Sequence, residues 1–276
     1  MNRNRRTGRQ ARRRRTKRQR NIIVTTAVFL AVLIVISIIL GQTCSGKRNT
    51  QTEVMATAPS TDADTSSEDS YMIQNVHVIE QKELKAGCET YACTMLLQIL
   101  GFKVDEFTIA DNYLDCHYVY TDEDGTKYGP DMHSGFAGTA YGGWGVYAPA
   151  MAKSMNRYLS DQKSKLKAYD QKDIPLETLC EEYVSKGVPV MVWATTDMDE
   201  PYVFDKWIVN YVDENAEAKM GDEVPWYMHE HCLVLIGYDK TNYIFADSTH
   251  GKISTFEKSL VAKRYEQMGK QTIVVK

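Results

Sequence analysis

The apolar residues of the chain form one unbroken run near the N-terminus and short periodic runs further along. Ile22 to Leu40 reads IIVTTAVFLAVLIVISIIL, and no charged residue occurs from Asn21 to Gly46. A helix of these 19 residues spans roughly 28 Å at about 1.5 Å per residue, close to the ~30 Å hydrocarbon core of a bilayer. The pattern predicts a single transmembrane helix over residues 21–41.

The segments on either side of this run are polar and have no apolar period. Residues 1–20 contain ten Arg, one Lys and no acid, a net charge of +11. Because the whole chain has a net charge of −3, the remaining residues have a net charge of −14. Residues 42–70 are rich in Ser, Thr and Asp and contain too few apolar side chains to build a core. We therefore expect a basic tail, the membrane span and then a disordered linker.

The basic tail predicts the orientation of the chain. An Arg-rich segment can bind nucleic acid, but beside a membrane span the positive-inside rule keeps it in the cytoplasm and exports the residues after the span. We expect no nucleic-acid partner, and a cell-membrane protein whose folded part lies outside. A cleaved signal peptide is the alternative, and Cys44 in LGQTC leaves lipidation open.

Residues 71–276 carry the periodic patterns of one folded domain. In LKAGCETYACTMLLQILG the apolar side chains after Cys88 recur at helical spacing, and Gly101 is a natural terminator. KGVPVMVWAT and HCLVLIGY are short apolar runs typical of buried strands, and a polar turn follows the second at 239–242.

The predicted helix begins at a cysteine, which makes Cys88 a candidate nucleophile. Unpaired amides and the helix macrodipole favour a thiolate in the first turn, whereas Cys93 lies mid-helix and is expected to be core. Core packing alone would also explain Cys88, so a base and an orienting group are needed. Whether the other exported cysteines pair stays open; they are Cys93, Cys116, Cys180 and Cys232.

The candidate base is His231, which precedes the apolar run 232–238. The next expected strand, 243–246, ends at Asp247, so a hairpin would bring the two side chains together. A regular hairpin with a four-residue loop would place them on opposite faces. We therefore predict a bulge or another irregularity that restores one face and lets Asp247 orient the imidazole.

Other residues complete the candidate site. Gln81 and the backbone N–H of Cys88 could both donate to a developing oxyanion. Gly87 permits a tight turn or the close approach of a substrate. YGGWGVYAP lacks the Lys of a phosphate loop, and we interpret it as a flexible loop whose Trp144 and Tyr147 line a substrate cleft.

A metal site is the weaker interpretation of the histidine-rich stretch. His229 and His231 would share one face of a strand while Cys232 points to the other, and no fourth ligand has a telling spacing. We expect neither a metal nor a cofactor.

The order of these residues resembles the papain-like cysteine peptidases. Gln81, GCE at 87–89, EHC at 230–232 and AD at 246–247 are similar to bacterial peptidase family thirty-nine, and closer to its stand-alone "peptidase C thirty-nine-like" branch. YGGWGVYAPAMAK, KGVPVMVWAT and LIGYD match that branch as well, so that the resemblance covers about 74–274. The chain departs from the leader-cleaving members in lacking an ATP-binding motif and in having Gly-Cys-Glu where they usually have Asp-Cys-Gly.

The resemblance implies a papain-like α+β fold with Cys88 as nucleophile, His231 as base, Asp247 as its orienting group and Gln81 as oxyanion donor. It implies a peptide or protein substrate, and we expect a monomer. Two other functions stay open. One is a catalytically silent cell-surface binding module, and the other is an amidase or acyltransferase acting on cell-wall peptides.

Overall fold

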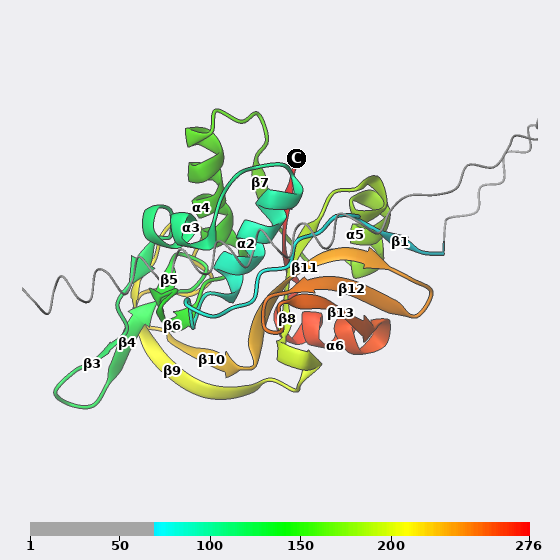
Figure 1. Ribbon diagram of the computed structural model, residues 1–276. Helices are drawn as coiled ribbons and strands as arrows, with labels where there is room; N and C mark the ends of the chain where they lie inside the picture. Colours follow the sequence, from blue (N-terminus) through cyan, green and yellow to red (C-terminus); the bar gives the residue numbers. More distant parts are fainter. Residues whose placement is uncertain (1–68) are drawn as a thin grey trace, which may run out of the picture. The chain divides into compact units, whose positions relative to one another are not determined.

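The computed structural model describes residues 69–276 (Figure 1). The predicted basic tail and the predicted membrane span at 21–41 lie outside the described residues, as does nearly all of the predicted linker. Within 69–276 no helix is both long and apolar enough to cross a bilayer.

The described chain combines helices with strands that pair mostly antiparallel, as expected for an α+β domain; β2 with β5 and β4 with β9 are the parallel pairs within residues 69–276. The α-helices are α2 (Cys88–Ile99), α3 (Glu106–Asn112), α4 (Ala148–Asp161), α5 (Leu176–Glu182) and α6 (Lys258–Gln267), with 3₁₀ turns at Val184–Lys186 and Thr196–Met198. The strands are β1 (Tyr71–Met72), β2 (Cys116–His117), β3 (Tyr120–Thr121), β4 (Lys127–Pro130), β5 (Phe136–Thr139), β6 (Gly142–Gly145), β7 (Ala168–Lys172), β8 (Val190–Thr195), β9 (Tyr202–Tyr211), β10 (Glu223–Met228), β11 (Glu230–Tyr238), β12 (Asn242–Asp247), β13 (Lys252–Glu257) and β14 (Gln271–Val275).

A seven-stranded sheet forms the centre of the described domain. Its order is β13-β12-β11-β8-β14-β7, with β1 paired to β11, and all of its pairs are antiparallel. The middle strands β8 and β11 are buried along almost their whole length. Strands that are covered on both faces have no solvent side, which explains why both read as continuous apolar runs.

Helices cover both faces of this sheet, so it has a core on each side (Figure 1). Trp193 and Cys232 pack with α2 and α4 in one core. Val192 and Leu233, their neighbours along β8 and β11, pack with α5 and α6 in the other. This alternation follows the two-residue period of a strand.

The hairpin of β11 and β12 contains the irregularity that the sequence predicts. Leu235 pairs with Phe245, but Gly237 pairs with Ile244, so the intervening Ile236 is an extra residue. Such a bulge shifts the alternation of the strand by one position. As a result the histidine before the apolar run and the aspartate that ends β12 face the same side of the sheet.

Two smaller sheets complete the domain, with orders β10-β9-β4-β3 and β2-β5-β6. The second contains β6, so the prediction of a flexible loop over YGGWGVYAP is wrong for residues 142–145. The glycines there allow close pairing with β5, because a Cβ on Gly143 would lie 2.7 Å from the carbonyl oxygen of Ala137. A glycine-rich segment is therefore a strand here for steric reasons.

Candidate active site

Cys88 is the first residue of α2, as the sequence predicts. The preceding Gly87 is the N-cap, and a Cβ on it would lie 2.7 Å from Cβ of Leu84 and 3.4 Å from Cβ of Ala140. Glycine is thus required by packing within the protein at this position. The side chain of Cys88 remains 8% exposed, in contrast to the fully buried Cys93.

The described cysteines are all free thiols, which settles the open question of their pairing within residues 69–276. They are Cys88, Cys93, Cys116, Cys180 and Cys232, of which only Cys116 is exposed. Cys93 is a core residue, as expected.

His231 and Asp247 form a buried pair on neighbouring strands. Nε2 of His231 lies 3.0 Å from Oδ1 of Asp247, and their side chains are 3% and 1% exposed. Asp247 also accepts hydrogen bonds from the Ser254 hydroxyl at 2.9 Å and from the Thr249 N–H at 3.0 Å. Burial by itself would raise the pKa of Asp247, but these hydrogen bonds and the imidazole outweigh it and hold the pKa below its ordinary value. Nδ1 is then the ring nitrogen that can exchange a proton.

One cleft of about 410 Å³ brings the predicted residues together. Cys88 comes from the start of α2, His231 from the start of β11 and Gln81 from the segment before α2. The lining residues are Gln81, Lys85, Ala86, Cys88, Gly143, Trp144, Thr196, Trp226, Met228, His229, Glu230, His231 and Thr249. Asp247 is bonded to the ring of His231 without lining the cleft, and Gly87 does not line it either.

Of the two aromatic residues predicted to line the cleft, Trp144 does so and Tyr147 does not. Nε1 of Trp144 donates to the carboxylate of Asp205 at 3.1 Å, which fixes the ring at the cleft wall. Tyr147 lines a separate cavity of about 520 Å³ beside His133. Tyr147 lies beyond the end of β6 and is the N-cap of α4, where its ring contacts that of His133 with 4.8 Å between the centroids.

Gln81 reaches the cleft, but its amide is already hydrogen-bonded. Nε2 donates to the carbonyl oxygens of Leu84 and Lys85, each at 3.1 Å, and Oε1 accepts from the Ser248 hydroxyl at 3.3 Å. The backbone N–H of Gln81 donates to the carbonyl of Ser248 at 2.7 Å. Gln81 therefore ties the segment before α2 to the end of β12, and donation to an oxyanion requires the amide to turn.

The thiol of Cys88 contacts two carboxyl groups rather than the imidazole. Sγ lies 3.3 Å from Oε2 of Glu89 and 3.9 Å from Oε2 of Glu230. Among residues 69–276, no hydrogen bond joins it to His231. Alternation along β11 explains the arrangement, because Glu230 shares the face of Cys232 that packs against α2, whereas His231 turns toward β12.

These carboxyl groups reverse the pKa effect that a helix start alone would have on Cys88. Burial raises the pKa of the thiol, and the charges of Glu89 and Glu230 raise it further. Burial also raises the pKa of Glu89 to about 7, and burial together with the charge of Glu89 raises the pKa of Glu230 well above its ordinary value. Within residues 69–276 neither carboxyl forms an ion pair with a Lys, Arg or His. Two carboxyls placed so close together in a buried site disfavour ionisation of both at once.

Glu89 and Glu230 are site residues that the sequence patterns do not single out. Glu89 is fully buried, and its Oε1 accepts the N–H of Val146 at 2.7 Å. The carbonyl of Val146 in turn accepts from Nε1 of Trp193 at 3.1 Å. The one feature of the sequence that could have pointed to them is their position, since each acid is next to a predicted catalytic residue in GCE and EHC.

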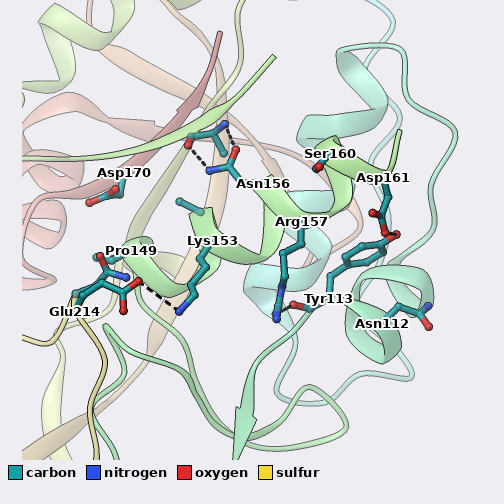
Figure 2. Close-up of a pocket in the computed structure, with 13 residues that line it drawn as sticks. Asn112, Tyr113, Pro149, Lys153, Asn156, Arg157, Ser160, Asp161, Asp170 and Glu214 are labelled. Carbon is teal, nitrogen blue, oxygen red and sulfur yellow. Dashed lines mark hydrogen bonds and ion pairs between the residues drawn. The ribbon is translucent and has the colours of Figure 1, made fainter. Parts of the chain in front are cut away.

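A larger cavity of about 660 Å³ lies along the outer side of α4 (Figure 2). Its polar groups are mostly engaged. Lys153 pairs with Asp213 at 2.9 Å, and the side-chain amide of Asn156 exchanges two hydrogen bonds of 2.8 Å with the backbone of Ala168. No cysteine or histidine lines this cavity. The volume of a cavity therefore does not identify the candidate active site, whereas the types of side chain that line it do.

Comparison with known proteins relates the described domain to one family. A model of the Peptidase_C39 like family matches residues 73–273. The crystal structure of a proposed C39-like peptidase from Bacillus anthracis is 27% identical in sequence, with a TM-score of 0.60 over 75% of this chain and 97% of that chain. No curated protein matches the chain.

Proposed function

Because the chain belongs to the Peptidase_C39 like family, we propose that it is a cysteine peptidase that cleaves peptide bonds through an acyl-enzyme. The observation that carries the proposal is the shared cleft of Cys88 and His231, with the imidazole held by Asp247 at 3.0 Å. The family supports a peptide or protein as the substrate.

The proposed reaction uses the side chains in papain-like roles. His231 takes the thiol proton of Cys88 at Nδ1, and the sulfur attacks the scissile carbonyl carbon. Asp247 stabilises the imidazolium. The oxyanion accepts from the N–H of Cys88 and, once its amide has turned, from Gln81. The leaving amine takes the proton back from Nδ1, and water then hydrolyses the thioester with His231 as base.

Attack requires one rearrangement within the cleft. In the resting arrangement Sγ of Cys88 faces Glu89 and Glu230. The thiol must turn from these carboxyls toward Nδ1 of His231 before it can lose its proton. Trp144 and Trp226 line the cleft, and we assign them to contacts with the substrate chain.

The location of the peptidase is part of the proposal. The uncharged span at 21–41 and the basic residues 1–20 support a membrane anchor with the catalytic domain outside the cell. We propose that it acts there as a monomer, without nucleic acid. Digestion of intact cells by an added protease should remove the folded domain, and its survival until the cells are lysed would contradict this orientation.

A catalytically silent binding module is the second candidate, and the contacts of Cys88 favour it specifically. A thiol whose pKa is raised by burial and by two acids is a weak nucleophile. Such a protein would bind peptides in the same cleft without cleaving them.

Cleavage of a peptide library by the full-length protein separates these candidates. We expect Cys88→Ala to abolish cleavage and Cys116→Ala, which removes an exposed thiol outside the cleft, to preserve it. Circular dichroism should show both variants folded. Binding of peptides with no cleavage by the wild-type protein would establish the silent module instead.

A further inference from the structure

The thiol of Cys88 and the carboxyls of Glu89 and Glu230 have the spacing of metal ligands. One donor atom from each residue lies within 4.8 Å of the other two. Tetrahedral zinc with bonds of roughly 2.0–2.3 Å keeps its ligands roughly 3.5 Å apart. The two distances from Sγ, 3.3 Å and 3.9 Å, lie on either side of that value. Small side-chain movements would suffice to close the three donors on one ion.

An unsatisfied oxygen at the cluster points to a missing partner. Within residues 69–276, Oε1 of Glu230 is buried and has no hydrogen-bond partner, while Oε2 of the same carboxyl faces Sγ of Cys88. Oε1 of Glu89, in contrast, accepts the N–H of Val146. A buried carboxyl oxygen without a donor is costly, and in the described part of the chain no cationic side chain pairs with either carboxyl. A bound cation would supply both the partner and the charge.

The donor types narrow the choice of ion. Mg²⁺ and Ca²⁺ prefer all-oxygen sites, whereas a thiolate beside carboxylates suits Zn²⁺ and similar thiophilic ions. Cys88 and Glu230 line the cleft, so an ion can enter from solvent and keep a water as its fourth ligand. In residues 69–276 this is the one group of three such side chains with metal-ligand spacing.

We propose that Cys88, Glu89 and Glu230 bind a thiophilic divalent cation such as Zn²⁺. Binding displaces the thiol proton and any proton on the two carboxyls, and the sulfur lone pair forms the bond to the metal. The nucleophile is then unavailable, so the cation is a reversible inhibitor of the site. Only this inhibitory consequence rests on the proposed peptidase function.

Cobalt reports on the site directly, because a thiolate bound to Co²⁺ gives a charge-transfer band in the near ultraviolet. The experiment uses the full-length protein with Cys44→Ser and Cys116→Ser, which removes the thiol outside the described residues and the exposed one within them. We expect one equivalent of Co²⁺ to produce the band and Zn²⁺ to displace it. Cys88→Ser in the same background should abolish the band.

The carboxyl ligands are tested by conservative variants that keep side-chain size. Glu89→Gln and Glu230→Gln should each weaken zinc binding by at least about 10-fold, the smaller end of the effect seen even for outer-shell partners. Glu200→Gln, an exposed acid outside the cleft, should leave binding unchanged. Full binding in both cleft variants would overturn the site and leave a carboxyl pair that binds protons only.

Alkylation of Cys88 links metal binding to the nucleophile without any substrate. Zn²⁺ should slow its labelling by iodoacetamide, and EDTA should restore the rate. A cobalt band that persists in Cys88→Ser, or labelling that Zn²⁺ does not change, would overturn the proposal. Zinc protection in a protein that cleaves no peptide would instead refute the peptidase and leave the metal site standing.

Discussion

The cleft has an imidazole half and a thiol half that differ in how their charges are balanced. The imidazole half consists of His231, Asp247, Thr249 and Ser254, and the thiol half of Cys88, Glu89 and Glu230. In the imidazole half the one carboxylate accepts three hydrogen bonds, and its pKa is lowered in spite of burial. In the thiol half one fully buried carboxyl, that of Glu89, and one half-buried carboxyl, that of Glu230, face a thiol, and all three pKa values are raised.

The two halves are therefore prepared for catalysis to different degrees. The base is already oriented, because Asp247 sits 3.0 Å from its Nε2. The nucleophile is held in its neutral form until the charge beside it changes. Control of such a site would act on the thiol half, through a proton or a cation, while the imidazole half stays as it is.

Disruption of the imidazole half should have the most severe consequence for activity. Asp247→Asn should lower kcat by on the order of 10⁴-fold, because an amide fails to hold the productive tautomer of the imidazole. Peptide cleavage measures the loss, with the exposed Asp170→Asn on β7 as the matched control. If the halves are independent, the alkylation rate of Cys88 stays at its wild-type value. A parallel drop in alkylation would contradict that independence.

The two halves should give opposite pH dependences of stability. Glu89 has a pKa of about 7 when folded against 4.5 ordinarily, so the folded state binds more protons and the unfolding free energy falls as pH rises through this range. A shift of that size corresponds to on the order of 3 kcal/mol. The contribution of Asp247, whose folded pKa lies below 3.8, is instead present above that value and is lost as pH falls through the folded pKa.

Urea unfolding between about pH 5 and pH 8 measures this dependence, since it spans the window in which Glu89 titrates. Glu89→Gln should flatten the fall in unfolding free energy over that window. An unchanged slope in the variant would show that other groups cause the fall.

The hydrogen bonds that link Trp193, Val146 and Glu89 are expected to contribute less to the free energy of unfolding. Trp193→Phe removes the donor to the carbonyl of Val146, whose N–H holds Glu89. Leaving that carbonyl unpaired in the core should cost about 1–3 kcal/mol of unfolding free energy. Trp226→Phe is the control, because Nε1 of Trp226 is buried without a hydrogen-bond partner and its removal breaks no hydrogen bond. Equal losses in the two variants would argue against the hydrogen bond.

The mildest change is expected when the thiol half loses a single charge. Burial is the main reason for the raised pKa of Cys88, and the charge of Glu89 comes next. Glu89→Gln removes only that charge, so the thiol pKa should fall and alkylation near neutral pH should become several-fold faster. The pH profile of iodoacetamide labelling measures this, with Glu200→Gln as the matched control. A slower reaction in Glu89→Gln would mean that the acid activates the thiol.

The sequence predicts most of the imidazole half and little of the thiol half, for a physical reason. His231 and Asp247 lie on consecutive strands, so local period and turn length are enough to place them and even to require a bulge. Glu89 and Glu230 meet only because α2 packs on β11, a tertiary contact without a local pattern. Their role, and the raised pKa of Cys88 that contradicts the expectation from a helix start, could not be derived from spacing.

The same distinction applies to the other predictions. A helix from Cys88 and a buried strand within KGVPVMVWAT follow from apolar period and length. The sequence pattern does not predict strand β6, because its glycines have no side chains that could alternate. They allow the backbone of β6 to pair closely with β5 instead. The glycine-rich segment predicts Trp144 and Tyr147 in one cleft, but the chain has left β6 and begins α4 at Tyr147, which lines another cavity.

The extra residue in β11 affects how homologous sequences should be classified as active or inactive. Successive side chains of a strand alternate between the two faces of the sheet. The extra residue Ile236 shifts this alternation by one position between the histidine and the aspartate. Deleting Ile236 would put His231 and Asp247 on opposite faces while every letter of GCE, EHC and AD stayed in place. A homologue with the full set of motifs but an interval shorter by one residue would thus be a pseudoenzyme that motif matching alone scores as intact. The number of residues between His and Asp therefore carries as much functional information as their presence.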